Sequence, residues 1–305
     1  MKIIAVMLLC VVSITSLAIS LNTSAHSALP HGSAMIAMSQ HDSEPVIDAR
    51  AKSTSNNPSS SKLHIAIVEY PPYEFSYIDQ DGKLQFDGVS VTLVKEVFRR
   101  LNQTFELQTL PWSRALKLLK EGKIDGLFEV LSRPERLAYA DFTQEVLMQE
   151  VVMLFVTEDS EITFTGELSS LADYQFGMRK DFSYGPYFDT AVEQKVIKHV
   201  TADVESTPLL LKLCTGDIDI LVAEKDTIHY VEKEVKALQS SSLRRCKNIK
   251  RLEQAVQSTP TYMAFSKQSD IKHVRDRFDQ VLRQMKQDGS YQKIIDEWKR
   301  ANLDK

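Results

Sequence analysis

The stretch LKLLKEGKIDGLFEV, Leu116–Val130, and the stretch LLLKLCTGDIDILVAEK, Leu209–Lys225, carry the same pattern. In each, an apolar helical segment ends at a glycine, an Ile-Asp pair follows, and a hydrophobic strand comes next. Glycine readily adopts the left-handed conformation that ends helices, so Gly122 and Gly216 are expected to mark helix ends. The repetition predicts two similar α/β lobes with the same helix-to-strand junction in each.

Strands and helices alternate around each repeat in the order strand, helix, strand, helix, strand. The segments are expected at residues 62–70, 89–102, 105–110, 113–122 and 124–130, and again at 174–179, 184–195, 196–201, 207–214 and 218–224. Strands joined by helices of this length form parallel sheets that are covered on both faces. The fold class is therefore α/β, with one sheet in each of two lobes.

Two further strands are predicted to connect the lobes. They are Val151–Val156 and a segment near Val256–Tyr262. The amphipathic helices that follow the second crossover are too few for a third lobe, so they complete the first one. We expect lobe one at 62–155 and 259–305 and lobe two at 156–258, with the two crossover strands acting as a hinge.

The composition excludes two classes of partner. The chain of 305 residues is 43% hydrophobic and 26% charged, which is enough to fill two modest cores. Its formal net charge is −4, and charges of both signs are interleaved without a basic block. Nucleic acid and membrane surfaces are therefore not expected as partners.

The N-terminus has the pattern of a secretory signal peptide, expected at residues 1–25. Lys2 precedes the apolar run Ile3–Val12, and small residues suited to cleavage follow, up to Ala18 and Ala25. The apolar run is about half of the roughly 20 residues that a membrane-spanning helix needs. The pattern indicates export to the periplasm.

Residues 26–61 are polar, rich in serine and without periodicity, and they predict a flexible tail. The histidines of this region, His26, His31 and His41, are widely and irregularly spaced, so no metal site is expected there. Neither the tail nor the rest of the chain suggests a cofactor.

The carboxyl ends of the strands predict where a ligand binds. In open parallel sheets, ligands bind beyond these ends, so the residues that follow each strand should face a cleft between the lobes. They combine aromatic rings, guanidinium groups and carboxylates, which suits a small polar solute or zwitterion. The candidate ligand-binding residues are Tyr70, Tyr73, Trp112, Glu129, Ser132, Arg136, Phe182, Ser183 and Glu224.

Five motifs in order carry a family resemblance. They are YPPYEF, FDGVSVTLVKEVFRRLN, GKIDGLFEVLSRPERLAYADFT, GDIDILVAE and MKQDGSYQKIIDEW. Together they resemble the periplasmic solute-binding proteins of polar amino acid uptake systems, bacterial family 3, over about Lys62–Lys299. The resemblance implies a monomeric two-lobe fold that closes on a small solute and delivers it to an ABC-type permease.

The resemblance also implies roles for particular residues. Arg136 in SRPER matches the arginine that binds a ligand carboxylate, and the region of Ser132 matches backbone groups that share this task. Glu224 falls where the family has an acidic residue for the ligand ammonium, Tyr70 matches the aromatic lid, and Trp112 sits where an apolar wall residue lies.

Lobe two departs from the family pattern at one point. Where the family usually has Gly-Thr-Thr at a helix start, this chain has Asp181, Phe182 and Ser183. An acidic side chain there repels a carboxylate, so a cationic, amine-rich or uncharged solute stays open as the ligand.

Several of these residues have a purely structural alternative. Arg136 could cap a helix or pair with a neighbouring carboxylate, and Trp112 could be part of the core. Asp125 and Asp219 repeat in KID and DID, but both precede strands at the end opposite the cleft, so they are interpreted as turn residues.

Cysteine usage fits an exported protein. Once Cys10 is removed with the signal peptide, Cys214 and Cys246 remain, and an even count predicts a disulfide between them. Two buried free thiols are the alternative.

Catalysis finds little support, because the chain has no recognisable nucleophile, zinc or phosphate-loop motif. We therefore expect a binding protein and not an enzyme. Two alternatives stay open. One is a receptor that presents its closed form to a membrane signalling protein; the other is an enzyme resembling the cyclohexadienyl dehydratases, in which Glu129 or Glu224 acts as a general acid.

Overall fold

The computed structural model describes residues 61–237 and 248–303. The predicted signal peptide, the predicted tail up to residue 60 and Cys246 lie outside these ranges. Within them, no helix has both the length and the apolar character needed to cross a membrane.

Lobe one is an α/β unit around a parallel core of three strands. β1 lies between β4 and β5 and is parallel to both. Its elements are β1 (Leu63–Ile67), β2 (Phe75–Ile78), β3 (Leu84–Asp87), α1 (Val89–Leu101), β4 (Phe105–Thr109), α2 (Trp112–Lys120), β5 (Gly126–Leu131), α3 (Pro134–Leu137), β6 (Ala140–Phe142), the short 3-10 helix η3 (Lys267–Ser269), α7 (Lys272–Gln287) and α8 (Ser290–Asn302). The predicted order of strands and helices is confirmed, and the structure adds the antiparallel hairpin β2–β3.

Lobe two repeats the arrangement, with β8 between β9 and β10 and parallel to both. Its elements are the 3-10 helix η1 (Leu168–Leu171), β8 (Gln175–Arg179), α4 (Pro186–Glu193), β9 (His199–Asp203), α5 (Ser206–Thr215), β10 (Ile220–Glu224), α6 (Lys225–Ala237) and β11 (Ile249–Arg251). The predicted helix ends are confirmed: Gly122 follows α2 with φ +67°, and Gly216 ends α5 with φ +79°.

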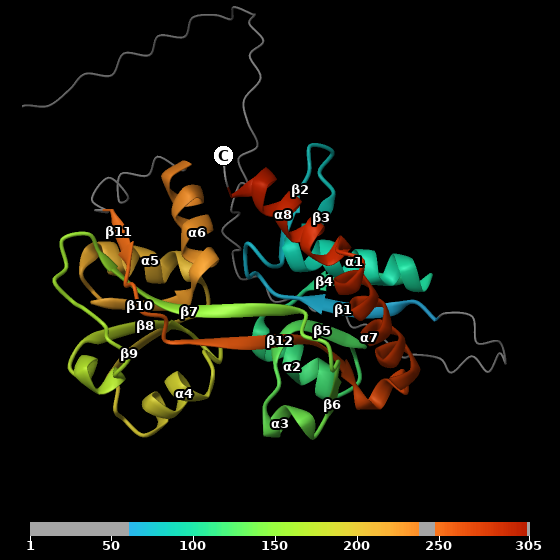
Figure 1. Cartoon of the computed structure of the whole chain (residues 1–305), viewed down its shortest axis with the longest axis horizontal. Coiled ribbons are helices and arrows are strands. Elements are labelled where there is room, and N and C mark those ends of the chain that lie inside the picture. The colour runs from blue at the N-terminus through green and yellow to red at the C-terminus, as the bar shows by residue number, and fades with distance from the viewer. Residues whose placement is uncertain (1–60, 238–247, 304–305) are drawn as a thin grey trace, which may run out of the picture. The chain divides into compact units, whose positions relative to one another are not determined.

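The two crossover strands join the lobes into one sheet. β7 (Met148–Thr157) and β12 (Gln257–Ser266) pair with each other in antiparallel fashion. β12 also pairs with β5, and β7 with β10, so the strand order is β4-β1-β5-β12-β7-β10-β8-β9. The prediction of two separate sheets is wrong. Each crossover strand pairs with the other along one edge and, along its opposite edge, with a strand of one lobe. Figure 1 shows them running from one lobe to the other.

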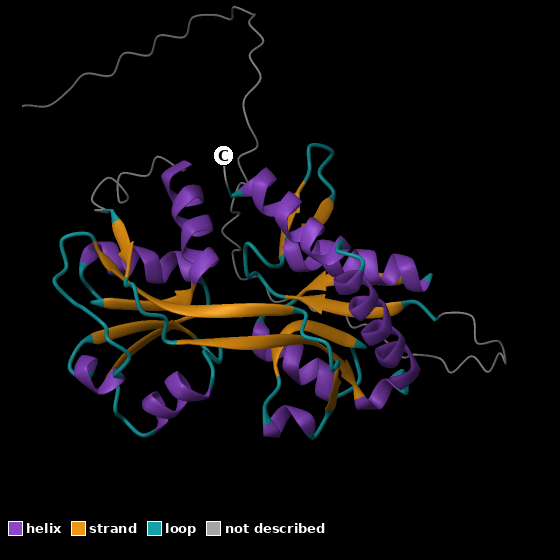
Figure 2. Ribbon diagram, viewed as in Figure 1, coloured by secondary structure: helices purple, strands orange, loops and turns teal. Residues whose placement is uncertain are grey.

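Helices cover both faces of the sheet in each lobe. In the view shared by Figure 1 and Figure 2, α1 and α8 lie above the lobe-one strands and α2 and α3 below them, while α5 and α6 lie above the lobe-two strands and α4 below them. α7 packs against α1 and α8. Side chains of a strand point alternately to its two faces. In β7, Val152 and Leu154 therefore belong to the core cluster under α4, whereas Met153 and Phe155 belong to the cluster under α5 and α6.

The aspartates of the repeated motif hold the starts of neighbouring strands together. The Oδ2 atom of Asp125 accepts a hydrogen bond from the backbone N–H of His64 at 2.9 Å. The Oδ2 atom of Asp219 accepts one from the backbone N–H of Gln175 at 2.8 Å. Both lie at the amino ends of the strands, as the turn interpretation predicts, so the repeated motif is a structural clamp.

Cys214, on α5, is disulfide-bonded. Its predicted partner Cys246 lies outside the described residues, so this pairing stays a prediction.

Candidate functional site

Aromatic side chains from both lobes meet between the ends of the strands. The ring of Phe182, which follows β8, lies 5.4 Å from the ring of Tyr70 and 5.3 Å from that of Trp112, measured between centroids. Tyr70 and Tyr73, which follow β1, have centroids 5.3 Å apart. The structure thus brings together four of the predicted site residues.

Hydrogen bonds between the lobes surround these rings. The indole N–H of Trp112 donates to the backbone carbonyl of Asp181 at 2.9 Å, and the hydroxyl of Ser113 donates to the Asp181 carboxylate at 2.6 Å. A guanidinium nitrogen of Arg133 donates to Asp189 at 2.7 Å and to the hydroxyl of Ser183 at 3.2 Å. The lobes are therefore in contact, and Asp181 contributes to this contact instead of facing a ligand carboxylate.

Arg179, at the end of β8, bonds to backbone groups of both lobes. Its Nη1 donates to the backbone carbonyl of Glu69 at 2.8 Å, and its Nε and Nη2 donate to that of Val204 at 3.0 and 2.8 Å. The guanidinium carbon lies 4.0 Å from the centroid of the Phe182 ring and 5.8 Å from that of Tyr70. Both distances fall within the range of cation–π contacts, so Arg179 is held by backbone carbonyls and aromatic faces.

Arg136 lies in α3 and is buried. Its Nη1 donates to the backbone carbonyl of Leu131 at 3.0 Å, and its guanidinium carbon lies 5.2 Å from the centroid of the Trp112 ring. Burial lowers its pKa. Ser132, just before it, is exposed.

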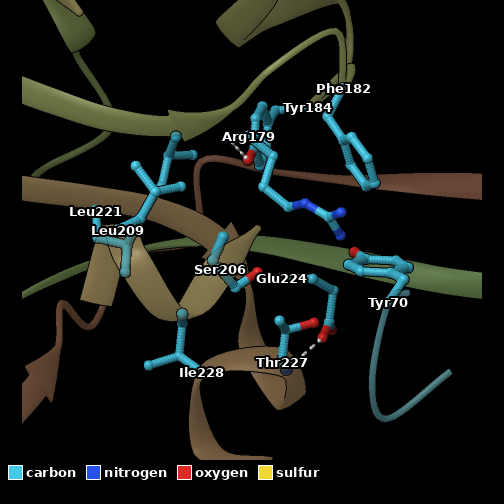
Figure 3. A pocket seen from close by; sticks show the side chains of 12 residues that line it. Tyr70, Arg179, Phe182, Tyr184, Ser206, Leu209, Leu221, Glu224, Thr227 and Ile228 are labelled. Carbon is cyan, nitrogen blue, oxygen red and sulfur yellow. Dashed lines mark hydrogen bonds between the residues drawn. The ribbon is translucent and has the colours of Figure 1, made fainter. Parts of the chain in front are cut away.

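A small hollow, partly open to solvent, lies beside Arg179. Figure 3 shows its lining, with the Arg179 guanidinium above and Glu224 beneath Tyr70. Three predicted residues, Tyr70, Phe182 and Glu224, line it; Arg136 does not. The full lining is Tyr70, Arg179, Phe182, Tyr184, Ser206, Leu209, Leu221, Val222, Ala223, Glu224, Thr227 and Ile228.

Glu224 ends β10 and is 2% exposed. Its Oε2 accepts hydrogen bonds from the backbone N–H groups of Asp226 at 2.6 Å and Thr227 at 3.2 Å, at the start of α6. Its Oε1 has no hydrogen-bond partner among the described residues. Burial, with a smaller contribution from the charge of Asp226, raises the pKa of Glu224 to about 7.

Glu129 lies in β5 with a left-handed φ of +55°. Its carboxylate accepts hydrogen bonds from the hydroxyls of Ser90 and Thr261. Burial raises the pKa of Glu129 to about 7, although these two hydrogen bonds act in the opposite direction.

Two further buried carboxyl groups belong to the same region and were not predicted. Glu150, on β7, is 6% exposed, and burial together with the charges of Glu129 and Glu224 raises its pKa well above the usual range. Glu74 is fully buried, neither of its carboxyl oxygens has a partner among the described residues, and its pKa is likewise raised, first by burial and then by Glu129.

The sequence did contain a signal for Glu150. It stands within MQEVVMLFV, where it is the acidic residue in an otherwise apolar strand. A charged residue at a buried strand position is costly without a partner, and it therefore marks a candidate functional position. Arg179 carries the same signal at the end of β8.

The sheet joined by two crossover strands, with its hollow between two α/β lobes, defines a two-lobe binding protein. Comparison with family models gives a match to the bacterial extracellular solute-binding proteins, family 3, over residues 63–301. The chain belongs to this family and is a solute-binding protein. Comparison with curated protein sequences gives no match.

Solved structures share the fold. A histidine kinase sensor domain with similarity to periplasmic binding proteins superposes with a TM-score of 0.65 at 22% identity, covering 78% of this chain and 96% of that one. The amino acid ABC transporter substrate-binding protein AbpA from Streptococcus pneumoniae, bound to L-arginine, gives 0.63 at 20% identity, with 80% and 97% covered. An arginine transport system periplasmic binding protein from Legionella pneumophila gives 0.62 at 18% identity, with 78% and 100% covered.

Proposed function

We propose that this protein binds an amino acid or a related small polar solute in the periplasm and delivers it to an ABC-type permease. The observation that carries the proposal is the hollow at the ends of β8 and β10, where Tyr70 and Phe182 bring aromatic faces from both lobes against Glu224. The solved relatives named above as amino acid transport proteins support the permease as partner.

The proposed ligand-binding set keeps the predicted residues and adds Arg179. Tyr70, Phe182 and Glu224 contact the solute in the hollow, with Tyr73 beside them. The remaining predicted residues act from the rim or from lobe one: Trp112, Glu129, Ser132, Arg136 and Ser183. The guanidinium of Arg136 lies against the Trp112 ring. It can bind an anionic part of the solute once a movement of the lobes separates these two side chains.

Closure about β7 and β12 is the proposed mechanism. The proposed division keeps lobe one at 62–155 and 259–305 and lobe two at 156–258. The change from one lobe core to the other lies inside β7, where residues 152–155 already pack in the lobe-two core. The contacts between the lobes, such as Arg133 with Asp189, stabilise the closed state, and a bound solute adds its own contacts to both lobes.

The test is a thermal-shift screen of the mature protein against amino acids, amines, organic acids and short peptides. A solute that binds the folded state raises the melting temperature by mass action. Small-angle scattering with the best hit should then show the radius of gyration falling. If the free protein is already closed, the radius of gyration stays unchanged and the distribution of lobe separations becomes narrower. A library without any hit at millimolar concentration would overturn the proposal.

A second candidate is a sensory receptor, favoured by the fold shared with a histidine kinase sensor domain. Transport and sensing are separated by uptake: cells that lack this protein take up a radiolabelled hit normally if its role is sensing alone.

Binding without turnover is part of the proposal. A carboxyl that keeps its proton near neutral pH can act as a general acid. The raised pKa of Glu129 and Glu224 suits them to this role, so the dehydratase hypothesis is tested directly. Formation of an aromatic product from a cyclohexadienyl acid would replace the binding proposal with an enzymatic one.

A further inference from the structure

Three buried carboxyl groups form a row across the strands that connect the lobes. These are Glu129 on β5, Glu150 on β7 and Glu224 on β10, here called the hinge carboxyls. The strand order β5-β12-β7-β10 places them on strands at and beside the two crossovers.

The register puts the row on one face of the sheet. Glu150 lies opposite Thr259 of β12, and Glu224 lies opposite Val152 of β7, two residues along from Glu150. Directly paired residues, and residues two apart in one strand, point to the same face. Thr261 lies two residues beyond Thr259 and therefore points to the same face. Its hydroxyl donates a hydrogen bond to Glu129, so the third carboxyl lies on this face as well.

The hinge carboxyls lack a cationic partner among the side chains that the structure describes. None of the lysine, arginine and histidine side chains of residues 61–233 and 248–303 forms an ion pair with Glu129, Glu150 or Glu224. Arg179, the guanidinium of the hollow, is directed instead at the backbone carbonyls of Glu69 and Val204.

Acceptor atoms in this region are left without donors. Within the described part of the chain, Oε1 of Glu224 and the hydroxyl oxygens of Thr227 and Thr259 are buried and have no hydrogen-bond partner. Glu224 and Thr227 both line the hollow. Buried polar atoms are costly unless paired. Oε1 of Glu224 therefore points to a ligand that brings an N–H donor, and the two hydroxyl groups can donate or accept.

Aromatic faces complete the arrangement. Tyr70 lies near the hinge carboxyls: burial raises the pKa of its hydroxyl, and the charges of Glu150, Glu224 and Glu129 raise it further. Its ring and that of Phe182 border the hollow. Aromatic faces attract cations, and the guanidinium carbon of Arg179 already lies 4.0 Å from the Phe182 ring centroid and 5.8 Å from that of Tyr70. A bound cation would favour the ionised form of the carboxyl groups, whose pKa values burial raises.

We propose that the hinge carboxyls and the Tyr70 ring form a cation site that selects solutes of net positive charge, and that Glu150 on the crossover strand β7 is one of its ligand-binding residues. This inference rests on the proposed function, because it assigns the charge of the solute that the cleft binds. The shared chemistry is an ammonium or guanidinium group, whether or not the same molecule carries a carboxylate.

Calorimetric titration of the mature protein with a charge series tests the inference. Cadaverine, L-lysine, L-norleucine and L-glutamate have similar lengths but net charges that fall from positive to negative, and agmatine with L-arginine extends the series to the guanidinium group. The cations should bind at least tenfold more tightly than L-norleucine and L-glutamate. Comparison of cadaverine with L-lysine shows whether a carboxylate contributes.

Two variants locate the site. Glu150→Gln and Glu224→Gln keep the shape of the side chain but cannot ionise to pair with a cation, so each should weaken the tightest cation at least tenfold. Glu158→Gln, just beyond the end of β7 and exposed, removes an equal charge and should leave the affinity within twofold. Circular dichroism confirms that each variant is folded before titration.

The outcomes separate this inference from the proposed function. Tighter binding of L-norleucine or L-glutamate than of the cations would overturn the cation site and leave the solute-binding function intact. A Glu150→Gln variant that binds the cation as wild type would remove Glu150 from the site. Absence of binding by every probe and by the wider screening library would overturn both.

Discussion

Replacing Glu129 by glutamine should stabilise the solute-free protein at alkaline pH and leave it unchanged at acidic pH. The folded protein raises the pKa of Glu129 from 4.5 to about 7, chiefly through burial. At about 1.4 kcal/mol per pH unit, this difference corresponds to about 3 kcal/mol of unfolding free energy.

The direction follows from the protonation states. A carboxyl whose pKa is raised by folding binds its proton more tightly in the folded state. Its stabilising contribution is complete below pH 4.5 and is lost as the pH rises through about 7. Glutamine resembles the protonated carboxyl and can keep hydrogen bonds to Ser90 and Thr261, so it does not lose this contribution.

The assay is urea unfolding of wild type and Glu129→Gln at pH 5 and pH 8, followed by tryptophan fluorescence. Trp112 and Trp298 both belong to the lobe-one core, the cluster that also contains residues of β5. At pH 8 the variant should be more stable by about 3 kcal/mol, and at pH 5 the two proteins should differ little. Glu158→Gln serves as the control for removal of an exposed charge.

An equal difference between variant and wild type at both pH values would refute the reasoning, because burial would then not act on the charged form alone. A variant less stable than wild type at pH 8 would show that the hydrogen bonds to the carboxylate outweigh its desolvation. The charge of Glu129 raises the pKa of Glu74, Glu150, Tyr70 and Tyr291 in turn.

Three further predictions concern the lobes. Phe182→Ala removes the ring contacts that join the lobes, each worth about 1 kcal/mol, and should increase the radius of gyration of the solute-free protein; an unchanged scattering profile would show that the ring does not hold the lobes together. Arg133→Ala breaks the pair with Asp189, but because Arg133 is partly exposed the loss of stability should stay below about 1 kcal/mol by urea unfolding, and a larger loss would indicate a structural role beyond this pair. Mass spectrometry of the unreduced mature protein should find Cys214 linked to Cys246, and two alkylatable thiols under denaturing, non-reducing conditions would contradict the bridge.

The elements of each lobe could be predicted because their hydrophobic periodicity is local. The hairpin β2–β3 could not, since its strands of four residues contain no buried position and leave Ile78 and Leu84 exposed. The continuous sheet was missed for another reason: the pairing of β7 with β12 joins residues about 100 positions apart, and no local pattern encodes it.

The lining of the hollow was predictable where it follows strand ends. Tyr70, Phe182 and Glu224 line the hollow as the rule for parallel sheets indicates. Glu150 was missed because that rule does not consider the interior of a crossover strand. The contacts of Arg136 could not be predicted from the sequence either, because its contact with the Trp112 ring depends on how α3 packs relative to α2.

The pairing of the crossover strands determines how the lobes can move. β7 and β12 are bonded to each other from Met148 to Val152, and each continues into the sheet of one lobe. A rotation of the lobes that preserves these bonds must change the twist of the two strands. The connection therefore resists rotation elastically and does not move freely. Amide hydrogens along this ladder should then stay protected from exchange throughout the opening and closing cycle.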